Sequence, residues 1–176
     1  MATEPILIPD ASAEPAKYKQ ALLDLIGDAN PLDTFEATVP QWRELTRDLT
    51  PAQLAAEPRD GEWSVAAITG HLFDVDLVQG FRWRLMLTED NPTYPGYNEK
   101  LWTPMPRLPF DQLLDAWAGL RAANLLVLRS AWPAAAERTA THAEQGPESF
   151  GQTLRKIAGH DVAHLNQLRR TVEAAV

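Results

Sequence analysis

The chain contains no cysteine among its 176 residues. A disulfide framework, a cysteine nucleophile and a thiolate metal ligand are therefore all excluded. Any metal that this protein binds has to be held by nitrogen and oxygen atoms. Any thiol chemistry needs a thiol that arrives with a substrate.

Long apolar runs and an excess of positive charge are also missing. No run of about eighteen apolar residues is present, which argues against a membrane-spanning helix. The first fifteen residues, MATEPILIPDASAEP, lack the basic start and apolar core of a secretory signal, so we expect a cytoplasmic protein. The net charge of −8 argues against a nucleic-acid partner, because a phosphate backbone is bound by clustered Lys and Arg.

What the chain does contain is a succession of segments with helical hydrophobic spacing. The clearest of these cover residues 62–87, 110–132 and 150–175. Ser64 and Ser149 are suitable N-caps for the first and last of them. Thr38 and Thr50 each begin a capping-box pattern that ends on a glutamine. Since no alternating segment indicates a strand, the sequence predicts an all-α protein built on about four long helices.

Proline divides the chain into parts. Residues 1–14, bounded by Pro15, are expected to form an N-terminal tail, and residues 15–176 a single helical domain. Residues 91–109 contain five prolines, which cannot all belong to one helix. In a small domain, a connection of this length is usually a long crossover, a lid or a wall of a binding site.

Histidines provide the main indication of chemistry. His160 and His164 are four residues apart on the helical face of Ile157, so their Cβ atoms are expected about 5–6 Å apart. His71 lies on the inward stripe of an earlier helix. Three inward imidazoles can hold one metal ion and leave a position open for water or substrate. The alternative is a set of hydrogen-bonded core histidines, although three buried imidazoles without a metal would each need other partners.

Two segments resemble the signatures of DinB-like proteins. EWSVAAITGHLFDVD (residues 62–76) resembles W-S-x(6)-H-L-x-D-x-[ED], and GHDVAHLNQL (residues 159–168) resembles H-D-x-x-H-L-x-Q-L. The resemblance implies an up-down-down-up four-helix bundle that holds a divalent metal on His71, His160 and His164. Imidazole also suits copper and iron, but we expect zinc or nickel. The resemblance further implies frequent homodimers and, for some members, S-transfer from bacillithiol or mycothiol.

The expected function is therefore thiol S-transfer, in which the metal activates a low-molecular-weight thiol for attack on a small electrophile. The partners would be that thiol, that electrophile and a second copy of the chain, with no nucleic acid and no membrane. One alternative is a non-catalytic bundle with a structural or vestigial metal, acting as a stress-related binding or dimerisation module. A hydrolase is a further alternative.

Other polar residues of these segments have open roles. Asp76 stands where glutamate is as frequent, and its shorter side chain is expected to lie beside or outside the metal site. Asp161 and Asp74 either orient a ligand imidazole or lie at the surface, and we favour a solvated Asp161. Gln167 either bonds a ligand or has a structural role, which we favour. Arg82 either meets a substrate carboxylate or forms a salt bridge, and the salt bridge is favoured.

Overall fold

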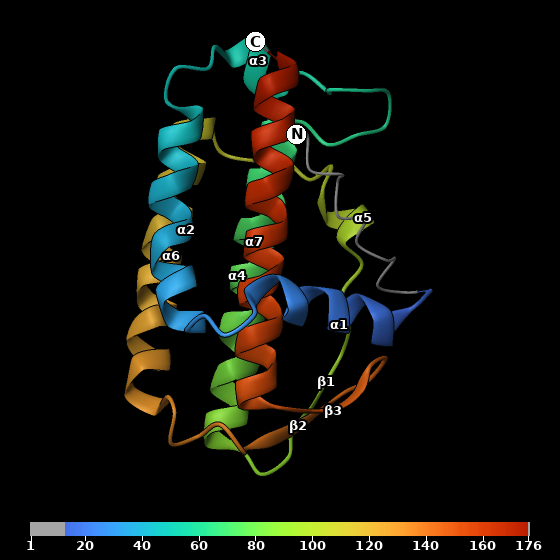
Figure 1. Ribbon diagram of the computed structural model, residues 1–176, viewed down its shortest axis with the longest axis vertical. Helices are drawn as coiled ribbons and strands as arrows, with labels where there is room; N and C mark the ends of the chain where they lie inside the picture. The colour runs from blue at the N-terminus through green and yellow to red at the C-terminus, as the bar shows by residue number, and fades with distance from the viewer. Residues whose placement is uncertain (1–12, 176) are drawn as a thin grey trace.

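The computed structural model describes residues 13–175, and their main elements form a four-helix bundle (Figure 1). Its long helices are α2 (Pro31–Thr46), α4 (Val65–Thr88), α6 (Phe110–Ala131) and α7 (Phe150–Ala175). In Figure 1, α2 and α7 run upward while α4 and α6 run downward, which confirms the expected up-down-down-up bundle. Residues 1–12 of the predicted tail lie outside the described residues.

The interior of the bundle follows from the apolar stripes of these helices. Helix α2 packs against α6 and α7, and α4 packs against the same two helices. Two apolar clusters fill the space between them, one around Phe35 and Trp83 and the other around Trp42 and Trp117. All four of these aromatic side chains are at most 2% exposed, so they supply much of the buried area that stabilises the fold.

Local capping sets where the helices begin. The Ser64 hydroxyl accepts a hydrogen bond from the backbone N–H of Ala67 at 3.2 Å, as predicted for the start of α4. The Ser149 hydroxyl likewise accepts from the N–H of Gln152 at 3.2 Å and starts α7. Thr50 forms the predicted capping box, but the helix that it begins, α3 (Pro51–Ala55), has only five residues.

The capping box predicted at Thr38 is wrong. Helix α2 starts earlier, at Pro31, where Asn30 Oδ1 accepts a hydrogen bond from the N–H of Leu32 at 3.1 Å. Thr38 lies inside that helix and donates its hydroxyl hydrogen to the carbonyl of Thr34 at 2.8 Å. The N-cap and N1 proline upstream already satisfy the requirements of a helix start, and α2 continues through Pro40.

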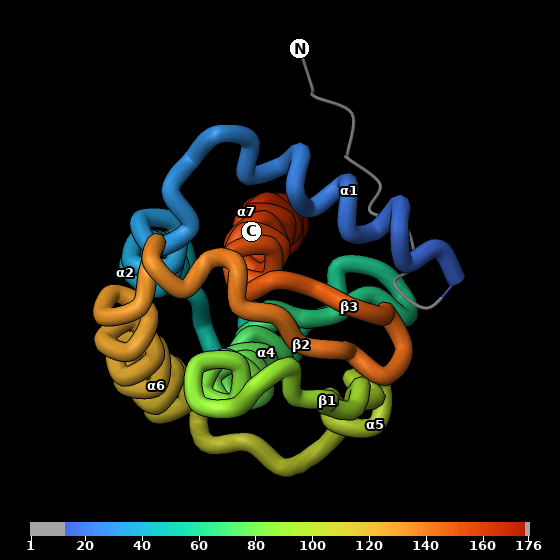
Figure 2. The backbone as a smooth tube through the Cα atoms, turned by 90° about the horizontal axis from the view of Figure 1, so that it is seen from below, coloured from blue at the N-terminus to red at the C-terminus, as the bar shows by residue number. Residues whose placement is uncertain are grey.

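A small sheet at the lower end of the bundle was not predicted (Figure 2). Its strands are β1 (Thr93–Tyr94), β2 (Thr139–His142) and β3 (Gly146–Ser149). Strand β2 pairs with β1 in parallel and with β3 in an antiparallel hairpin. No strand was expected in these segments, because the sequence shows no alternating pattern there. Strands of two to four residues are too short to show an alternating pattern, and pairing with distant segments creates them.

Two further segments lie against the outside of α4 and α7. Helix α1 (Pro15–Ile26) crosses α7, and a Cβ added to Gly159 would lie 1.9 Å from the carbonyl oxygen of Leu22. Glycine is therefore required for this close helix crossing. The predicted crossover between α4 and α6 contains β1 and the short helix α5 (Glu99–Trp102). In Figure 1 it passes along the side of the bundle, where it forms one wall of the site described below.

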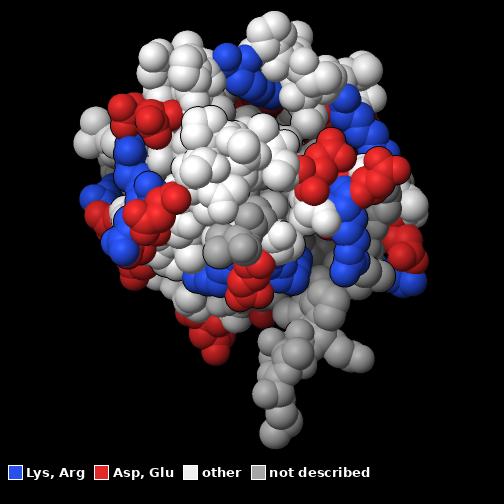
Figure 3. Space-filling view, turned by 90° about the horizontal axis from the view of Figure 1, so that it is seen from above, with Lys and Arg blue, Asp and Glu red and all other residues white. Residues whose placement is uncertain are grey.

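Hydropathy and the charges at one end of the bundle describe the surface of residues 13–175. Within residues 13–175, every helix is too short or too polar to cross a bilayer. Figure 3 views the end of the bundle where α7 ends, and side chains of both charges are interspersed around an uncharged centre.

Candidate metal centre

Three histidines converge in the interior between α4 and α7. His160 Nε2 lies 3.2 Å from His71 Nε2 and 3.1 Å from His164 Nε2. His71 comes from α4, while His160 and His164 occupy successive turns of α7. His71 and His160 are buried and His164 is partly exposed. The structure thus brings together the three side chains that the sequence singled out. Among the described residues, they are the one group of three such side chains whose ligand atoms lie close enough together to hold a metal ion.

The spacing of the nitrogens fits a shared cation. Ligand nitrogens at about 2.0–2.1 Å from one zinc ion are about 3.3–3.4 Å apart in a tetrahedron and about 2.9 Å apart at right angles. The observed 3.1–3.2 Å lies between these values. His160 Nε2 faces the Nε2 atoms of both His71 and His164, so their lone pairs repel one another unless a cation or a shared proton lies between them. The donor set therefore suits a divalent metal.

Burial keeps these imidazoles in the neutral form that binds metals. Desolvation, with the nearby His164 and Arg107 side chains, lowers the pKa of His71 to about 3. Desolvation also lowers the pKa of His160 well below its usual value, and that of His164 is lowered for the same main reason. Protons therefore compete weakly with a metal at neutral pH.

Gln167 holds one of the imidazoles in the orientation that a metal requires. Its Oε1 lies 2.7 Å from Nδ1 of His164. Because an amide oxygen only accepts hydrogen bonds, Nδ1 is the protonated nitrogen and Nε2 presents its lone pair to the cluster. Of the two roles considered for Gln167, the structure shows the hydrogen bond to an imidazole of the cluster.

An aromatic side chain covers the cluster. The Trp63 ring stacks on His164 with an interplanar angle of 9° and a centroid distance of 6.4 Å. Its centroid is also 4.9 Å from that of His71. On another side, Glu99 Oε2 lies 3.8 Å from Nδ1 of His71. The imidazoles are thus bordered by an apolar ring and a half-exposed carboxylate.

Asp76 and Asp161 belong to a separate buried network around Arg121 of α6. Arg121 Nε donates to Asp76 Oδ2 at 2.6 Å, and Nη1 donates to Asp161 Oδ2 at 2.6 Å. Trp117 Nε1 also donates to Asp76 Oδ2, at 2.7 Å. The expectation of a solvated Asp161 is wrong, since it is 0% exposed. Asp76 lies outside the three-histidine cluster, which was one of its two expected positions.

Asp74 has neither of the roles considered from the sequence. It is buried, and its two carboxylate oxygens accept from Arg107 Nη1 and Nη2 at 2.7 and 2.5 Å. Arg107 lies at the end of the crossover, just before α6. The bidentate pair therefore anchors the crossover to α4, which a sequence pattern could not indicate because the two residues belong to different elements.

Two of the three imidazoles open into a cleft of about 570 Å³ between α4, α7, α1 and the crossover. His71 and His160 line it, together with Arg82, His142 and Lys156. Neither His142 nor Lys156 was identified from the sequence. A salt bridge was favoured for Arg82, but no carboxylate of the described residues lies within 4.0 Å of that guanidinium. The favoured interpretation of Arg82 is therefore wrong.

Comparisons with known proteins agree with this geometry. The family model of the DinB superfamily matches residues 34–168, so the chain belongs to that superfamily. A Bacillus mycoides protein named "Putative metal-dependent hydrolase" is 32% identical over 128 residues, covering 70% of this chain and 74% of its own. An Oceanobacillus iheyensis protein of the same name is 33% identical over 120 residues, covering 67% and 70%.

The fold has a solved counterpart. The structure of YfiT from Bacillus subtilis, titled "a probable metal-dependent hydrolase with an unusual four-helix bundle topology", matches with a TM-score of 0.69. The match covers 88% of this chain and 87% of that one at 22% identity. At this identity the likeness establishes the fold, and it agrees with the bundle topology seen in Figure 1.

Proposed function

We propose that this protein is a metal-dependent enzyme that transfers a low-molecular-weight thiol to a small electrophile. The observation that carries the proposal is the convergence of three neutral imidazoles, with Nε2 separations of 3.1 and 3.2 Å, beside a cleft of about 570 Å³. When bound there, a divalent cation supplies the positive charge that makes a thiol or a water molecule lose its proton near neutral pH.

Each residue of the site has a defined task in this proposal. His71, His160 and His164 hold the cation, for which zinc or nickel is proposed, and three protein ligands leave a position open. Gln167 orients His164, and Trp63 limits access of water. Because the chain has no cysteine, the sulfur nucleophile comes from a small molecule. Its S–H bond breaks and an S–C bond forms to the electrophile, while the bond from that carbon to its leaving group breaks and the leaving group departs with the electron pair. Glu99, whose Oε2 lies 3.8 Å from Nδ1 of His71, is proposed to take the proton.

Hydrolysis is the second candidate, and the names of the two relatives favour it. The same histidines would hold the cation, and water would take the place of the thiol. The two candidates differ in their requirement for a cosubstrate. A hydrolase turns over an activated ester without any thiol, whereas a transferase consumes thiol and electrophile in equal amounts.

The test begins with the metal content of the purified protein. We expect about one divalent ion per chain, lost in His160→Ala and retained in His142→Ala, which removes a buried histidine outside the cluster. The loaded protein is then given bacillithiol or mycothiol with monochlorobimane, and separately p-nitrophenyl acetate without thiol. Thiol consumption that disappears on chelation supports the transferase. Ester hydrolysis alone would favour the hydrolase, and bound metal without either activity would favour the non-catalytic bundle.

A further inference from the structure

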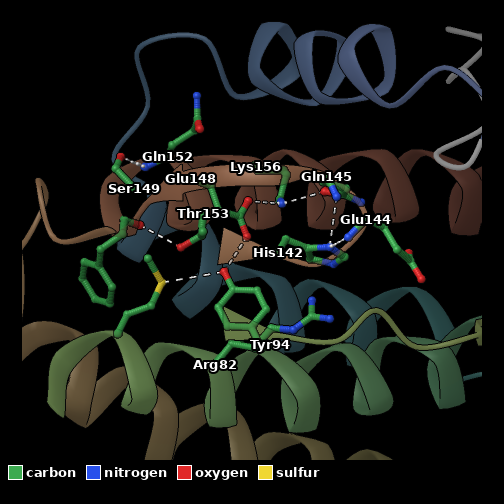
Figure 4. A network of polar contacts seen from close by, with 12 residues as sticks. Arg82, Tyr94, His142, Glu144, Gln145, Glu148, Ser149, Gln152, Thr153 and Lys156 are labelled. Carbon is green, nitrogen blue, oxygen red and sulfur yellow. Dashed lines mark hydrogen bonds and ion pairs between the residues drawn. The ribbon is translucent and has the colours of Figure 1, made fainter. Parts of the chain in front are cut away.

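The cleft has a second polar end, away from the imidazoles and next to the small sheet. Figure 4 shows Arg82, His142 and Lys156 gathered there from α4, β2 and α7. Each of the three side chains is 4–5% exposed, although each carries or can carry a positive charge. The proposed thiol and metal chemistry uses none of them, so their burial beside a cleft calls for another explanation.

Arg82 has very little internal compensation for its charge. Its Nη2 donates to the backbone carbonyl of Pro95 at 2.5 Å, and the guanidinium carbon lies 4.9 Å from the centre of the Tyr94 ring. A guanidinium has five N–H donors, and this one has no carboxylate of the described residues within 4.0 Å. Arg82 therefore lines the cleft with donors that are left for a ligand.

Lys156 and His142 add donors of the same kind. The Lys156 ammonium donates to Glu148 Oε2 at 2.6 Å and to Gln145 Oε1 at 3.2 Å, which uses two of its three hydrogens. His142 Nδ1 accepts from the backbone N–H groups of Glu144 and Gln145, at 3.1 and 3.3 Å. The neutral imidazole therefore carries its proton on Nε2, which is a donor.

The charges at this end favour a singly charged anion. Glu148 is buried, accepts the Tyr94 hydroxyl at 2.5 Å and neutralises Lys156, which leaves the charge of Arg82 in excess. Glu144 also lines the cleft, but it is exposed and its charge is solvated. A planar carboxylate accepts two parallel N–H bonds from a guanidinium and brings one negative charge.

We propose that Arg82, with Lys156 and His142, binds a carboxylate on the small molecule whose reacting end lies at the three histidines. This inference rests on the proposed function for the identity of that reacting end. Lys156 precedes His160 by one helical turn, about 6 Å along α7, and Arg82 follows His71 by about 16 Å along α4. Leu22, Val75 and Ile157 line the cleft as well. The ligand is thus an elongated molecule with an apolar middle and a terminal carboxylate.

The test uses hexanoate as the probe and hexanamide as its uncharged equivalent. Both are titrated calorimetrically into the full-length protein with the metal that it carries, and again after chelation. We expect hexanoate to bind at least about tenfold more tightly than hexanamide in both states, because a hydrogen bond to a charged group is lost in the amide. Arg82→Gln should weaken hexanoate binding by about 10- to 100-fold, and Arg82→Lys should weaken it less.

Arg84→Gln is the matched control. Arg84 is on the same helix, but its guanidinium donates to Gly80 O and Asn124 Oδ1 and lies outside the cleft. We expect this variant to bind hexanoate as the wild type does. Any of four outcomes would overturn the proposal. Hexanoate and hexanamide bind equally well, or Arg82→Gln and Arg84→Gln have equal effects. Alternatively, inorganic phosphate binds more tightly than hexanoate, or hexanoate binding is lost on chelation. Since binding is measured without turnover, absence of transferase activity leaves this test intact.

Discussion

Arg121 and Arg82 are two arginines with almost the same exposure, 4% and 5%, and opposite surroundings. Arg121 contacts two carboxylates and the carbonyl of Phe35, and its charge is neutralised inside the bundle. Arg82 contacts one backbone carbonyl and borders a cleft. Burial of a charged side chain therefore does not by itself indicate a binding site. The informative observation is whether the protein supplies the opposite charge.

The pKa values of Arg121 and Arg82 are shifted in opposite directions for the same reason. Burial disfavours the charged form of Arg121, but Asp161 and Asp76 together outweigh it and raise the pKa of its guanidinium. For Arg82, burial dominates over more distant acidic groups and lowers the pKa. Arg121 is thus part of a closed structural network, whereas a bound anion would stabilise the charged form of the buried Arg82 guanidinium.

The largest effect is expected when the closed network is broken. Arg121→Met leaves Asp76 and Asp161 buried without their partner, and removing one member of a buried ion pair costs about 3–5 kcal/mol. We expect the free energy of unfolding, measured by urea denaturation with circular dichroism, to fall by this amount. The triple variant Arg121→Met, Asp76→Asn, Asp161→Asn removes all three charges and should recover a large part of the loss. A single variant as stable as the wild type would contradict the assignment.

The elements of the bundle were predictable because their signals are local. Residues 150–175 were predicted as a helix and are helical with the same limits, since Ser149 and the apolar stripe both act within a few residues. The three histidines were found for a similar reason. His160 and His164 have helical spacing within α7, and His71 lies on the apolar stripe of α4, whose start Ser64 caps. Their function as metal ligands stays a prediction, because what the structure shows is their convergence.

Pairings between elements could not be predicted. Arg121 is separated from Asp76 and Asp161 by about 40 residues on either side, and which helix faces meet depends on packing rather than on spacing. The cationic end of the cleft comes from α4, β2 and α7, and β2 exists only through its pairing with β1 and β3. His142 and Lys156 gave no signal in the sequence, and Arg82 was considered there as a carboxylate-binding residue without the neighbours that β2 and α7 supply.

An intermediate effect is expected at the imidazoles, where the buried polar groups are neutral. Gln167→Ala removes the acceptor that holds His164 in the metal-binding orientation, and loss of such a partner lowers metal affinity by about 10- to 100-fold. The measurement is competition for zinc with a chromophoric chelator. Asn166→Ala is the matched control, since that neighbouring amide contacts Arg169 instead. Equal affinities of the two variants would show that Gln167 does not orient the ligand.

The smallest effect on stability is expected for Arg82→Gln, although its burial matches that of Arg121. The substitution removes one hydrogen bond to Pro95 but also a desolvated charge, and it leaves no carboxylate of the described residues within 4.0 Å unpaired. We expect the free energy of unfolding to change by less than about 1 kcal/mol, since the lost hydrogen bond and the relieved desolvation oppose each other. Hexanoate at ten times its Kd should stabilise the wild type by about 1.4 kcal/mol and the variant by much less. A loss comparable with that of Arg121→Met would show that Arg82 is a structural arginine after all, and the distinction between the two networks would fail.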